Sequence, residues 1–441
     1  MMSKQKIIQA LSGNVIEVAL GFITIMFITR NYTQEQAGIY FLIMAIVAVL
    51  NNLKEGFLQN GFVKYYVESQ GDRTILQSGL LITWAWDVLN VVVFGCITFF
   101  NESLAPFLPF YLIQVVGYSH YRWTLFIHKS DLNLATIFRV NILVLVGVCS
   151  GLLMVYLWQL PIHYCLMAAG IAYGLGTFSF PENRNLLFKA LWGRPSKQRL
   201  YQLCNFGKYG FLKELSGSIS HQSGVFLAAY FLTMGDTALL GLANRYAVLI
   251  AIPGSSLSGL IYPILLKVGI DSGKLRAAAS EGIGKMYALL IPLALMICLA
   301  SPLLIIGLHG STYAFAAIIL IIRVLLTTFL LPLGTGFSSI MNVMNHPERI
   351  TKLVLITSLV NLTAMIISMP YLGIWGAMLC PVLTEIVGFV IMKKGLRVIQ
   401  LHMSDIAIQV MQFWRYWFRA WVPGLWMKRR IGAQASQSEA F

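Results

Sequence analysis

Long apolar segments recur along the whole chain, and short polar connections separate them. A helix of about 20 apolar residues crosses the hydrocarbon core of a bilayer, so each segment predicts a transmembrane helix. We expect twelve such spans, at residues 8–29, 37–60, 75–99, 104–127, 134–157, 162–186, 210–232, 238–265, 281–306, 313–343, 350–369 and 373–394. The pattern therefore predicts an all-α integral membrane protein.

Lys and Arg gather in every second connection between these segments. The connections in between hold only isolated groups, such as Glu35, Glu102 and Asp236, or no charge at all. Basic residues concentrate on the cytoplasmic side of membrane proteins. The alternation therefore predicts an even number of spans and two cytoplasmic termini.

The composition agrees with a membrane protein. The chain is 58% hydrophobic and only 11% charged, with a mean hydropathy of +0.73, whereas soluble domains have about 25% charged residues. Its net charge of +15 is explained by the inner loops and the anionic inner leaflet, so we expect lipid contacts and no nucleic-acid partner. The cysteines lack metal-ligand spacing, and nucleotide-binding and hydrolase motifs are absent. We expect no enzyme activity, no cofactor and no metal.

The two halves of the chain look related. A shift of about 203 residues superposes several Gly, Lys and Arg positions, among them Gly56 on Gly259, Lys64 on Lys267 and Arg73 on Arg276. We therefore expect two six-helix bundles in parallel orientation, with a substrate site between them, although chance matches in an apolar sequence are the alternative. The expected parts are residues 1–188, a cytoplasmic linker at 189–209, a second bundle at 210–395 and a tail at 396–441.

The tail contains an amphipathic pattern. Residues 405–427 combine Arg415 and Arg419 with a series of Trp residues, which is typical of a helix that lies in the inner membrane interface. We expect this helix to anchor the chain, and binding of a partner enzyme stays open.

Carboxylates inside the predicted spans are candidates for ion coupling. Glu17, Asp87 and Glu214 each interrupt an apolar segment, where a charged side chain costs about 2.5–3.5 kcal/mol and so requires a cavity or a partner. Such groups can take up H⁺ or bind Na⁺. The alternative for each position is a polar contact between packed helices.

Basic and amide side chains inside the spans are candidates for substrate binding. We expect Arg245, Arg323, Lys54, Asn51 and Asn342 to bind the substrate. The arginines suit an anionic headgroup, because guanidinium groups bind phosphate with paired hydrogen bonds. Three alternatives stay open. Arg245 could snorkel to the outer surface, Arg323 could pair with a carboxylate such as Glu385, and Lys54 and Glu55 could pair with neighbouring helices.

Short motifs carry a family resemblance. The run Thr29–Tyr40 contains an Arg, a short acidic loop and a Gly-x-Tyr sequence at the entrance to the second span. Its counterpart around Gly235–Tyr246, and the aromatic-Pro sequence Tyr262-Pro263, are similar. In these features residues 1–395 resemble the polysaccharide (O-antigen-type) flippases of the multidrug/oligosaccharidyl-lipid/polysaccharide (MOP) exporter superfamily. Ala243 departs from the family pattern, which has a Tyr there.

The resemblance implies a transport mechanism. Two bundles would rock around a central cationic cavity and move a polyprenyl-diphosphate-linked oligosaccharide to the outer leaflet of a bacterial cytoplasmic membrane, for surface polysaccharides such as lipopolysaccharide. Arg245 and Arg323 would bind the diphosphate, and Glu17, Asp87 or Glu214 would couple a H⁺ or Na⁺ gradient. Polysaccharide-assembly enzymes would be possible partners.

Two other functions stay open. The first is a multidrug or organic-cation antiporter of the same superfamily, which Lys54, Arg245 and Arg323 disfavour because they would repel a cation. The second is a membrane-embedded oligosaccharide polymerase or transferase, which generally needs a sizeable outward loop. The predicted outward connections are too short for one.

Overall fold

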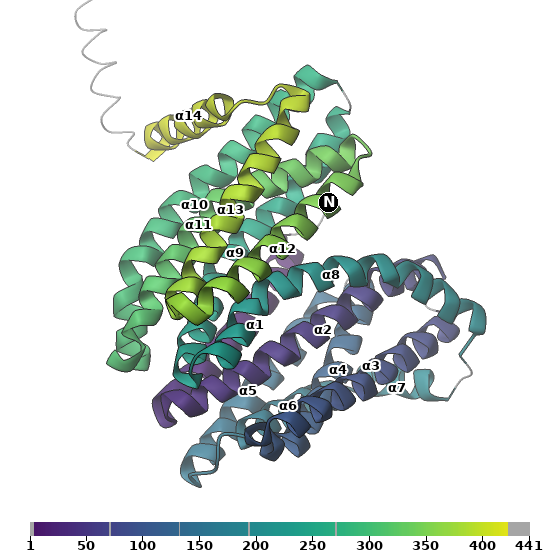
Figure 1. The fold of residues 1–441 in the computed structure, drawn as a ribbon. Helices are drawn as coiled ribbons and strands as arrows, with labels where there is room; N and C mark the ends of the chain where they lie inside the picture. The colour runs from purple at the N-terminus through teal and green to yellow at the C-terminus, as the bar shows by residue number, and fades with distance from the viewer. Residues whose placement is uncertain (1–3, 70–71, 132, 193–194, 270, 422–441) are drawn as a thin grey trace, which may run out of the picture. The chain divides into compact units, whose positions relative to one another are not determined.

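The computed structural model describes residues 4–69, 72–131, 133–192, 195–269 and 271–421. In these ranges the protein contains α-helices and three short 3₁₀ turns, and no strand. Figure 1 labels the helices α1 (Lys4–Asn31), α2 (Gln34–Glu68), α3 (Arg73–Phe100), α4 (Leu108–Ser130), α5 (Leu134–Leu157), α6 (Tyr164–Phe178), α7 (Pro181–Leu191), α8 (Lys197–Phe231), α9 (Met234–Val268), α10 (Ser272–His309), α11 (Ala314–Val343), α12 (Pro347–Leu372), α13 (Ile374–Leu396) and α14 (Met403–Trp421).

The helices confirm the all-α membrane fold. Each predicted span corresponds to one helix from α1 to α6 or from α8 to α13. Within the described residues, eight helices are long and apolar enough to cross a bilayer, namely α2, α3, α5 and α9 to α13. The other four, α1, α4, α6 and α8, are shorter or carry more polar residues, and α1 and α4 contribute charged groups to the site described below.

The sixth span is shorter than predicted. Helix α6 ends at Phe178, and a separate helix α7 begins at Pro181, whereas the sequence analysis placed one span over 162–186. Proline has no N–H to continue the helical ladder, and it favours an extended conformation of the residue before it. Phe180 has φ −96° and ψ 129°, as expected before a proline. The predicted boundary was wrong because the span was extended past Phe180, although Pro181 and the polar residues 182–185 follow it.

The chain divides into two compact units. Unit 1 comprises Met1–Arg245, Leu304–Ala316 and Asn361–Ala377, and unit 2 comprises Tyr246–Leu303, Ala317–Val360 and Met378–Phe441. Helix α8, which the sequence analysis assigned to the second bundle, belongs to unit 1. Its first residues also occupy the second half of the predicted linker at 189–209. The division into two six-helix bundles stays a prediction.

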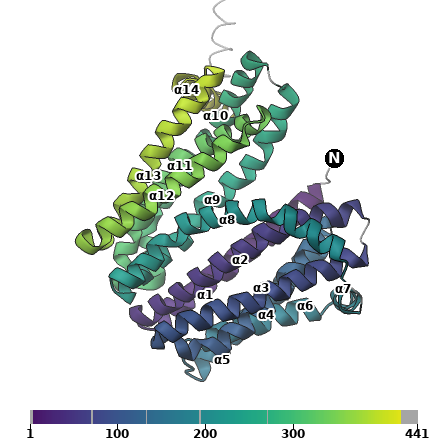
Figure 2. The same ribbon diagram turned by 45° about the vertical axis from the view of Figure 1, so that its right-hand side comes forward.

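Helices of unit 1 approach each other closely where both lack side chains. Helices α2 and α8 run side by side (Figure 2), and a Cβ added to Gly210 would lie 1.9 Å from the carbonyl oxygen of Gly56. Helices α4 and α6 meet in the same way, because a Cβ on Gly117 would lie 2.1 Å from the Gly170 oxygen. Small residues permit this packing. Lipid tails are as apolar as the side chains, so van der Waals contact rather than the hydrophobic effect holds such helices together.

Helices α2 and α9 begin with the same capping arrangement. At the start of α2, the Thr33 amide donates to the Gln36 side chain at 3.1 Å, and the Gln36 amide donates back to the Thr33 hydroxyl at 3.3 Å. Thr233 and Asp236 form the same reciprocal pair before α9, at 3.3 and 3.1 Å. These capping boxes satisfy amides that the first turn leaves free.

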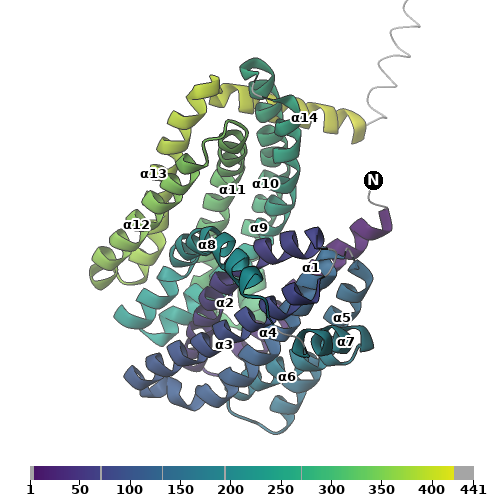
Figure 3. The same cartoon turned by 90° about the vertical axis from the view of Figure 1, so that its right-hand side faces the viewer.

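In unit 2, the predicted tail helix is present. Helix α14 crosses the ends of α10 and α13 (Figure 3). The Arg276 guanidinium donates two hydrogen bonds of 3.0 Å to Asp405, one from Nε and one from an Nη. A Cβ on Gly284 would lie 2.6 Å from the Cβ of Gln409. Helix α14 is therefore docked on α10 by an ion pair and by close packing. The predicted helix 405–427 is confirmed as far as Trp421, and its remaining residues lie outside the described ones.

We predict that neutralising Asp405 releases α14. Hydrogen bonds from Arg276 hold the pKa of the Asp405 carboxyl below its usual range, so the docked state favours the charged form. The ion pair therefore stabilises the docked helix fully above about pH 4, and this stabilisation is lost as the pH falls further. Asp405→Asn should speed amide hydrogen exchange in residues 403–416 at neutral pH. Asp271→Asn, which changes an exposed N-terminal carboxylate of α10, should leave that exchange unchanged; equal effects would contradict the docking role.

Candidate substrate cavity

A cavity of about 330 Å³ lies inside unit 1. Helices α1, α2, α4, α5, α6 and the start of α9 provide its walls. Its polar lining consists of tyrosines, amides, one threonine and three charged groups: Tyr40, Tyr118, Tyr121, Tyr173, Asn51, Asn52, Gln114, Asn141, Thr24, Glu17, Arg122 and Arg245. A polar cavity among apolar helices is the setting expected for a transported polar ligand.

Arg122 is the central charged group of this cavity. Its guanidinium forms a 2.6 Å ion pair with Glu55 of α2 and lies 3.6 Å from Glu17 of α1. The hydroxyl of Tyr121 is 2.8 Å from the Asn141 side-chain oxygen and 3.2 Å from Glu17. One arginine therefore joins α1, α2 and α4 through two carboxylates.

Arg122 is a candidate site residue that was not predicted from the sequence. It lies within α4, inside the predicted span 104–127, and it lines the cavity. Gln114, Tyr118, Tyr121 and Arg122 recur at the spacing of one helical face, as i, i+4, i+7 and i+8. That polar stripe was the signal that could have identified it.

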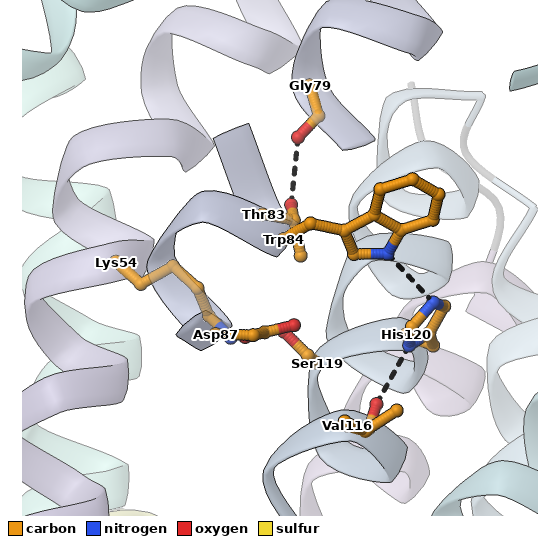
Figure 4. A network of polar contacts seen from close by, with 8 residues as sticks. All are labelled: Lys54, Gly79, Thr83, Trp84, Asp87, Val116, Ser119 and His120. Carbon is orange, nitrogen blue, oxygen red and sulfur yellow. Dashed lines mark hydrogen bonds and ion pairs between the residues drawn. The ribbon is translucent and has the colours of Figure 1, made fainter. Parts of the chain in front are cut away.

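A second polar cluster joins α2, α3 and α4 (Figure 4). Lys54 Nζ lies 3.2 Å from the Asp87 carboxylate, and their side chains are only 3% and 8% exposed. The Ser119 hydroxyl donates to the same Asp87 oxygen at 2.6 Å. Lys54 and Glu55 thus pair with different neighbouring helices, as one of the open alternatives proposed. Neither Lys54 nor Asp87 belongs to the cavity wall, and an ion-coupling role for Asp87 stays a prediction.

The other residues predicted for unit 1 fall into two groups. Glu17, Asn51 and Arg245 line the cavity together. Glu214 instead packs over α2, where its Cγ lies 2.3 Å from the position of a Cβ on Gly56. Arg245 forms no ion pair with any residue that the structure describes, and its role at a headgroup stays a prediction.

The residues predicted for unit 2 are not part of this cavity. Arg323 is half-buried in the middle of α11, and Asn342 is exposed near the end of that helix. The alternative pairing of Arg323 with Glu385 is not formed in the described structure. The joint role of Arg245 and Arg323 at one headgroup stays a prediction.

The first-loop motif binds a helix end. Arg30 Nε donates to the carbonyl oxygen of Leu308 at 2.6 Å, and its Nη donates to Gly307. The Thr29 hydroxyl lies 2.5 Å from His309 Nδ1. A cation at a helix C-terminus satisfies free carbonyls and the negative end of the dipole. Arg30 therefore stabilises the end of α10.

The described residues contain no group of three His, Cys, Asp or Glu side chains that could hold a metal ion. The six cysteines are free thiols.

The fold is similar to solved transporter structures. The lipid II flippase MurJ in an inward closed conformation matches with a TM-score of 0.68 and 14% identity, over 95% of this chain and 93% of that one. An inward-facing multidrug resistance MATE family transporter of the MOP superfamily matches with a TM-score of 0.70 and 14% identity, over 88% and 95%. A Vibrio cholerae MATE transporter matches with a TM-score of 0.56 and 14% identity, over 89% and 96%.

The sequence itself gives no such match. No family model and no curated protein matches it, and the resemblance to O-antigen-type flippases in particular stays a prediction. The structural likeness nevertheless covers about nine-tenths of the chain or more. The protein therefore has the fold shared by the lipid II flippase MurJ and the MATE transporters of the MOP superfamily.

Proposed function

We propose that this protein is a flippase for a lipid-linked oligosaccharide. It moves a polyprenyl-diphosphate-linked glycan across a bacterial cytoplasmic membrane by alternating access, for assembly of a surface polysaccharide, and a H⁺ or Na⁺ gradient drives its return. The observation that carries the proposal is Arg245, a cation without an ion pair in the described structure that lines a polar membrane cavity. The fold shared with a lipid II flippase supports it.

The energetics of buried charge favour an anionic substrate. Insertion of a charged side chain into a bilayer costs about 2.5–3.5 kcal/mol. No ion pair among the described residues offsets this cost for Arg245 or Arg323. A diphosphate offers oxygens that accept paired hydrogen bonds from guanidinium groups. The negative charge of a bound headgroup would therefore offset the cost of the two arginine charges during transport.

A multidrug exporter is the second candidate. Glu17 is 39% exposed, and four tyrosines line the same cavity. A carboxylate beside aromatic faces suits an organic cation. The likeness to MATE transporters supports this reading as much as the likeness to the flippase supports the first.

Deletion of the gene in its host distinguishes these functions. Lipid-linked sugars are extracted from the deletion strain, and their leaflet is determined with a membrane-impermeant glycan-modifying reagent. Accumulation of a finished oligosaccharide-lipid facing the cytoplasm, with loss of surface glycan, is the expected result. Single repeat units that already face outward would indicate a polymerase instead, and an unchanged glycan profile with altered drug sensitivity would indicate a multidrug exporter.

We predict that Arg245→Gln and Arg323→Gln each reduce translocation about tenfold or more, because charge-assisted hydrogen bonds contribute about 1.5–3 kcal/mol. The leaflet assay in the complemented deletion strain measures the loss. Arg139→Gln is the matched control, since Arg139 is an exposed arginine of α5 outside the cavity wall. Wild-type translocation by a correctly inserted double variant would overturn the headgroup assignment.

A further inference from the structure

Two buried amides in the cavity wall have oxygen atoms without a partner. Asn51 of α2 and Gln114 of α4 are 5% and 3% exposed, and neither side-chain oxygen accepts a hydrogen bond among the described residues. Gln114 makes only a weak contact, from Nε2 to the sulfur of Met44 at 3.9 Å. Buried polar groups are nearly always satisfied. These two oxygens therefore point to a ligand that donates hydrogen bonds.

The same wall also offers a free donor and aromatic faces. Arg122 Nε is buried without a partner in the described structure, although the rest of its guanidinium is paired. Tyr118, Tyr121 and Tyr173 pack together, with centroids 5.1 Å apart for Tyr118–Tyr173 and 5.0 Å for Tyr121–Tyr173. The ligand should thus combine hydroxyl donors, an oxygen acceptor and an apolar C–H face. A pyranose ring has all three.

The charges of the cavity argue against a free cation there. Arg122 already lies between Glu55 and Glu17, in the place that a coordinated cation would occupy. A quaternary ammonium ion has no N–H or O–H group to donate to Asn51 and Gln114. A volume of about 330 Å³ is at the small end of ligand pockets, which suits a sugar ring rather than a whole oligosaccharide.

We propose that this cavity binds one pyranose unit of the transported glycan, an inference that rests on the proposed flippase function. Asn51 and Gln114 accept hydrogen bonds from sugar hydroxyls, and Arg122 Nε donates one to a sugar oxygen. The tyrosines contact the C–H face of the ring. The cavity thereby recognises the glycan, while Arg245 is available to the attached diphosphate.

Saturation-transfer NMR on the full-length protein, in micelles of a detergent without sugar, tests this site. The probes are free glucose, galactose, mannose and N-acetylglucosamine, and tetraphenylphosphonium is the organic cation for comparison. We expect saturation transfer to the ring protons of at least one of them, at the millimolar affinity that a ligand of about a dozen non-hydrogen atoms reaches. Asn51→Leu and Gln114→Met should each weaken binding about tenfold, as the loss of a hydrogen bond predicts. Asn90→Leu is the control, because Asn90 is also buried with an unpartnered oxygen but lies outside the cavity wall.

A second pair of variants tests the cavity by filling it. Gly21 lines the cavity, and a Cβ added there would meet no atom within 4 Å. Gly21→Leu should therefore block sugar binding without displacing the backbone. Gly95→Leu is matched to it, since Gly95 also has open space around an added Cβ but lies on α3, outside the wall.

The outcomes separate the cavity from the overall function. Sugar binding that Gly21→Leu abolishes and Gly95→Leu keeps would establish the site. No transfer to any hexose, or equal losses in the cavity and control variants, would overturn it. Transfer to tetraphenylphosphonium alone, lost in Gly21→Leu, would overturn it in favour of an organic cation. If the deletion strain accumulates cytoplasm-facing oligosaccharide-lipid while no hexose binds, the pyranose site alone is wrong.

Discussion

Replacement of Lys54 by Met is expected to lower the free energy of unfolding by about 3–5 kcal/mol, the usual cost of removing one partner of a buried ion pair. The Lys54 and Asp87 side chains are 3% and 8% exposed. Met fills nearly the same volume as Lys, so the substitution leaves no cavity. The loss of stability arises because the Asp87 carboxylate stays buried without its counter-ion. Without the ammonium, Asp87 keeps only the hydrogen bond from Ser119, and its second oxygen already has no partner in the described structure.

A double-mutant cycle distinguishes this effect from a packing defect. Reversible unfolding in mixed micelles should show that Lys54→Met/Asp87→Leu regains most of the lost stability, because no buried charge remains. Lys285→Met serves as the control. It breaks the exposed pair with Glu281, whose side chains are 56% and 55% exposed, and should cost no more than about 1 kcal/mol. Similar losses for Lys54→Met and Lys285→Met would contradict the argument.

The same double variant addresses ion coupling. If Asp87 only neutralises Lys54, the stable double variant should keep its transport rate and its dependence on the ion gradient. If Asp87 carries the coupling ion, transport should fail although the fold is restored. Glu17 and Glu214 would be the remaining carboxylates to substitute in the first case.

Gly210→Ala should destabilise unit 1 by about 1–3 kcal/mol, the typical cost of overpacking. The new methyl group would lie 1.9 Å from the backbone oxygen of Gly56, so α2 and α8 must move apart. No side-chain rotation can relieve a clash with a carbonyl oxygen. The helix propensity gain of Ala over Gly, about 1 kcal/mol, offsets only part of this cost.

Gly217→Ala, on the same helix, provides the matched comparison. A Cβ at Gly217 would meet no atom within 4 Å, so the propensity gain acts alone and should raise stability by up to about 1 kcal/mol. Opposite signs for the two substitutions, measured in the same unfolding assay, are the expected result. Destabilisation by both would mean that α8 requires glycine for another reason than the contact with α2.

Local sequence was sufficient for the helices and the class of protein. Apolar length alone located α3, α5 and α11 to α13, because each helix satisfies its own backbone hydrogen bonds. Helix α10 begins at Ser272, before the predicted span at 281–306. The break at Pro181 was encoded just as locally, by the proline and by the polar residues 182–185 after it, although the predicted span extended past it. The amphipathic pattern around Trp414 likewise indicated α14 before any contact was known.

Pairing between helices could not be read from one sequence. Arg122 lies in the C-terminal half of α4, inside the predicted span 104–127, and its sequence position does not show which groups it contacts. Only the packing of α1 and α2 against α4 brings Glu17 and Glu55 to it. Lys54 and Asp87 are 33 residues apart in the chain, and a hydropathy profile cannot tell a paired charge from a free one.

The sequence by itself determined that this chain is a multi-helix membrane protein with polar groups inside its spans, since hydrophobicity and helical period are local properties. Tertiary structure alone decided which of those groups line a cavity and which neutralise each other. Side-chain contacts depend on the rotation and crossing of helices that are far apart in the chain, and close approaches such as Gly56 with Gly210 set both.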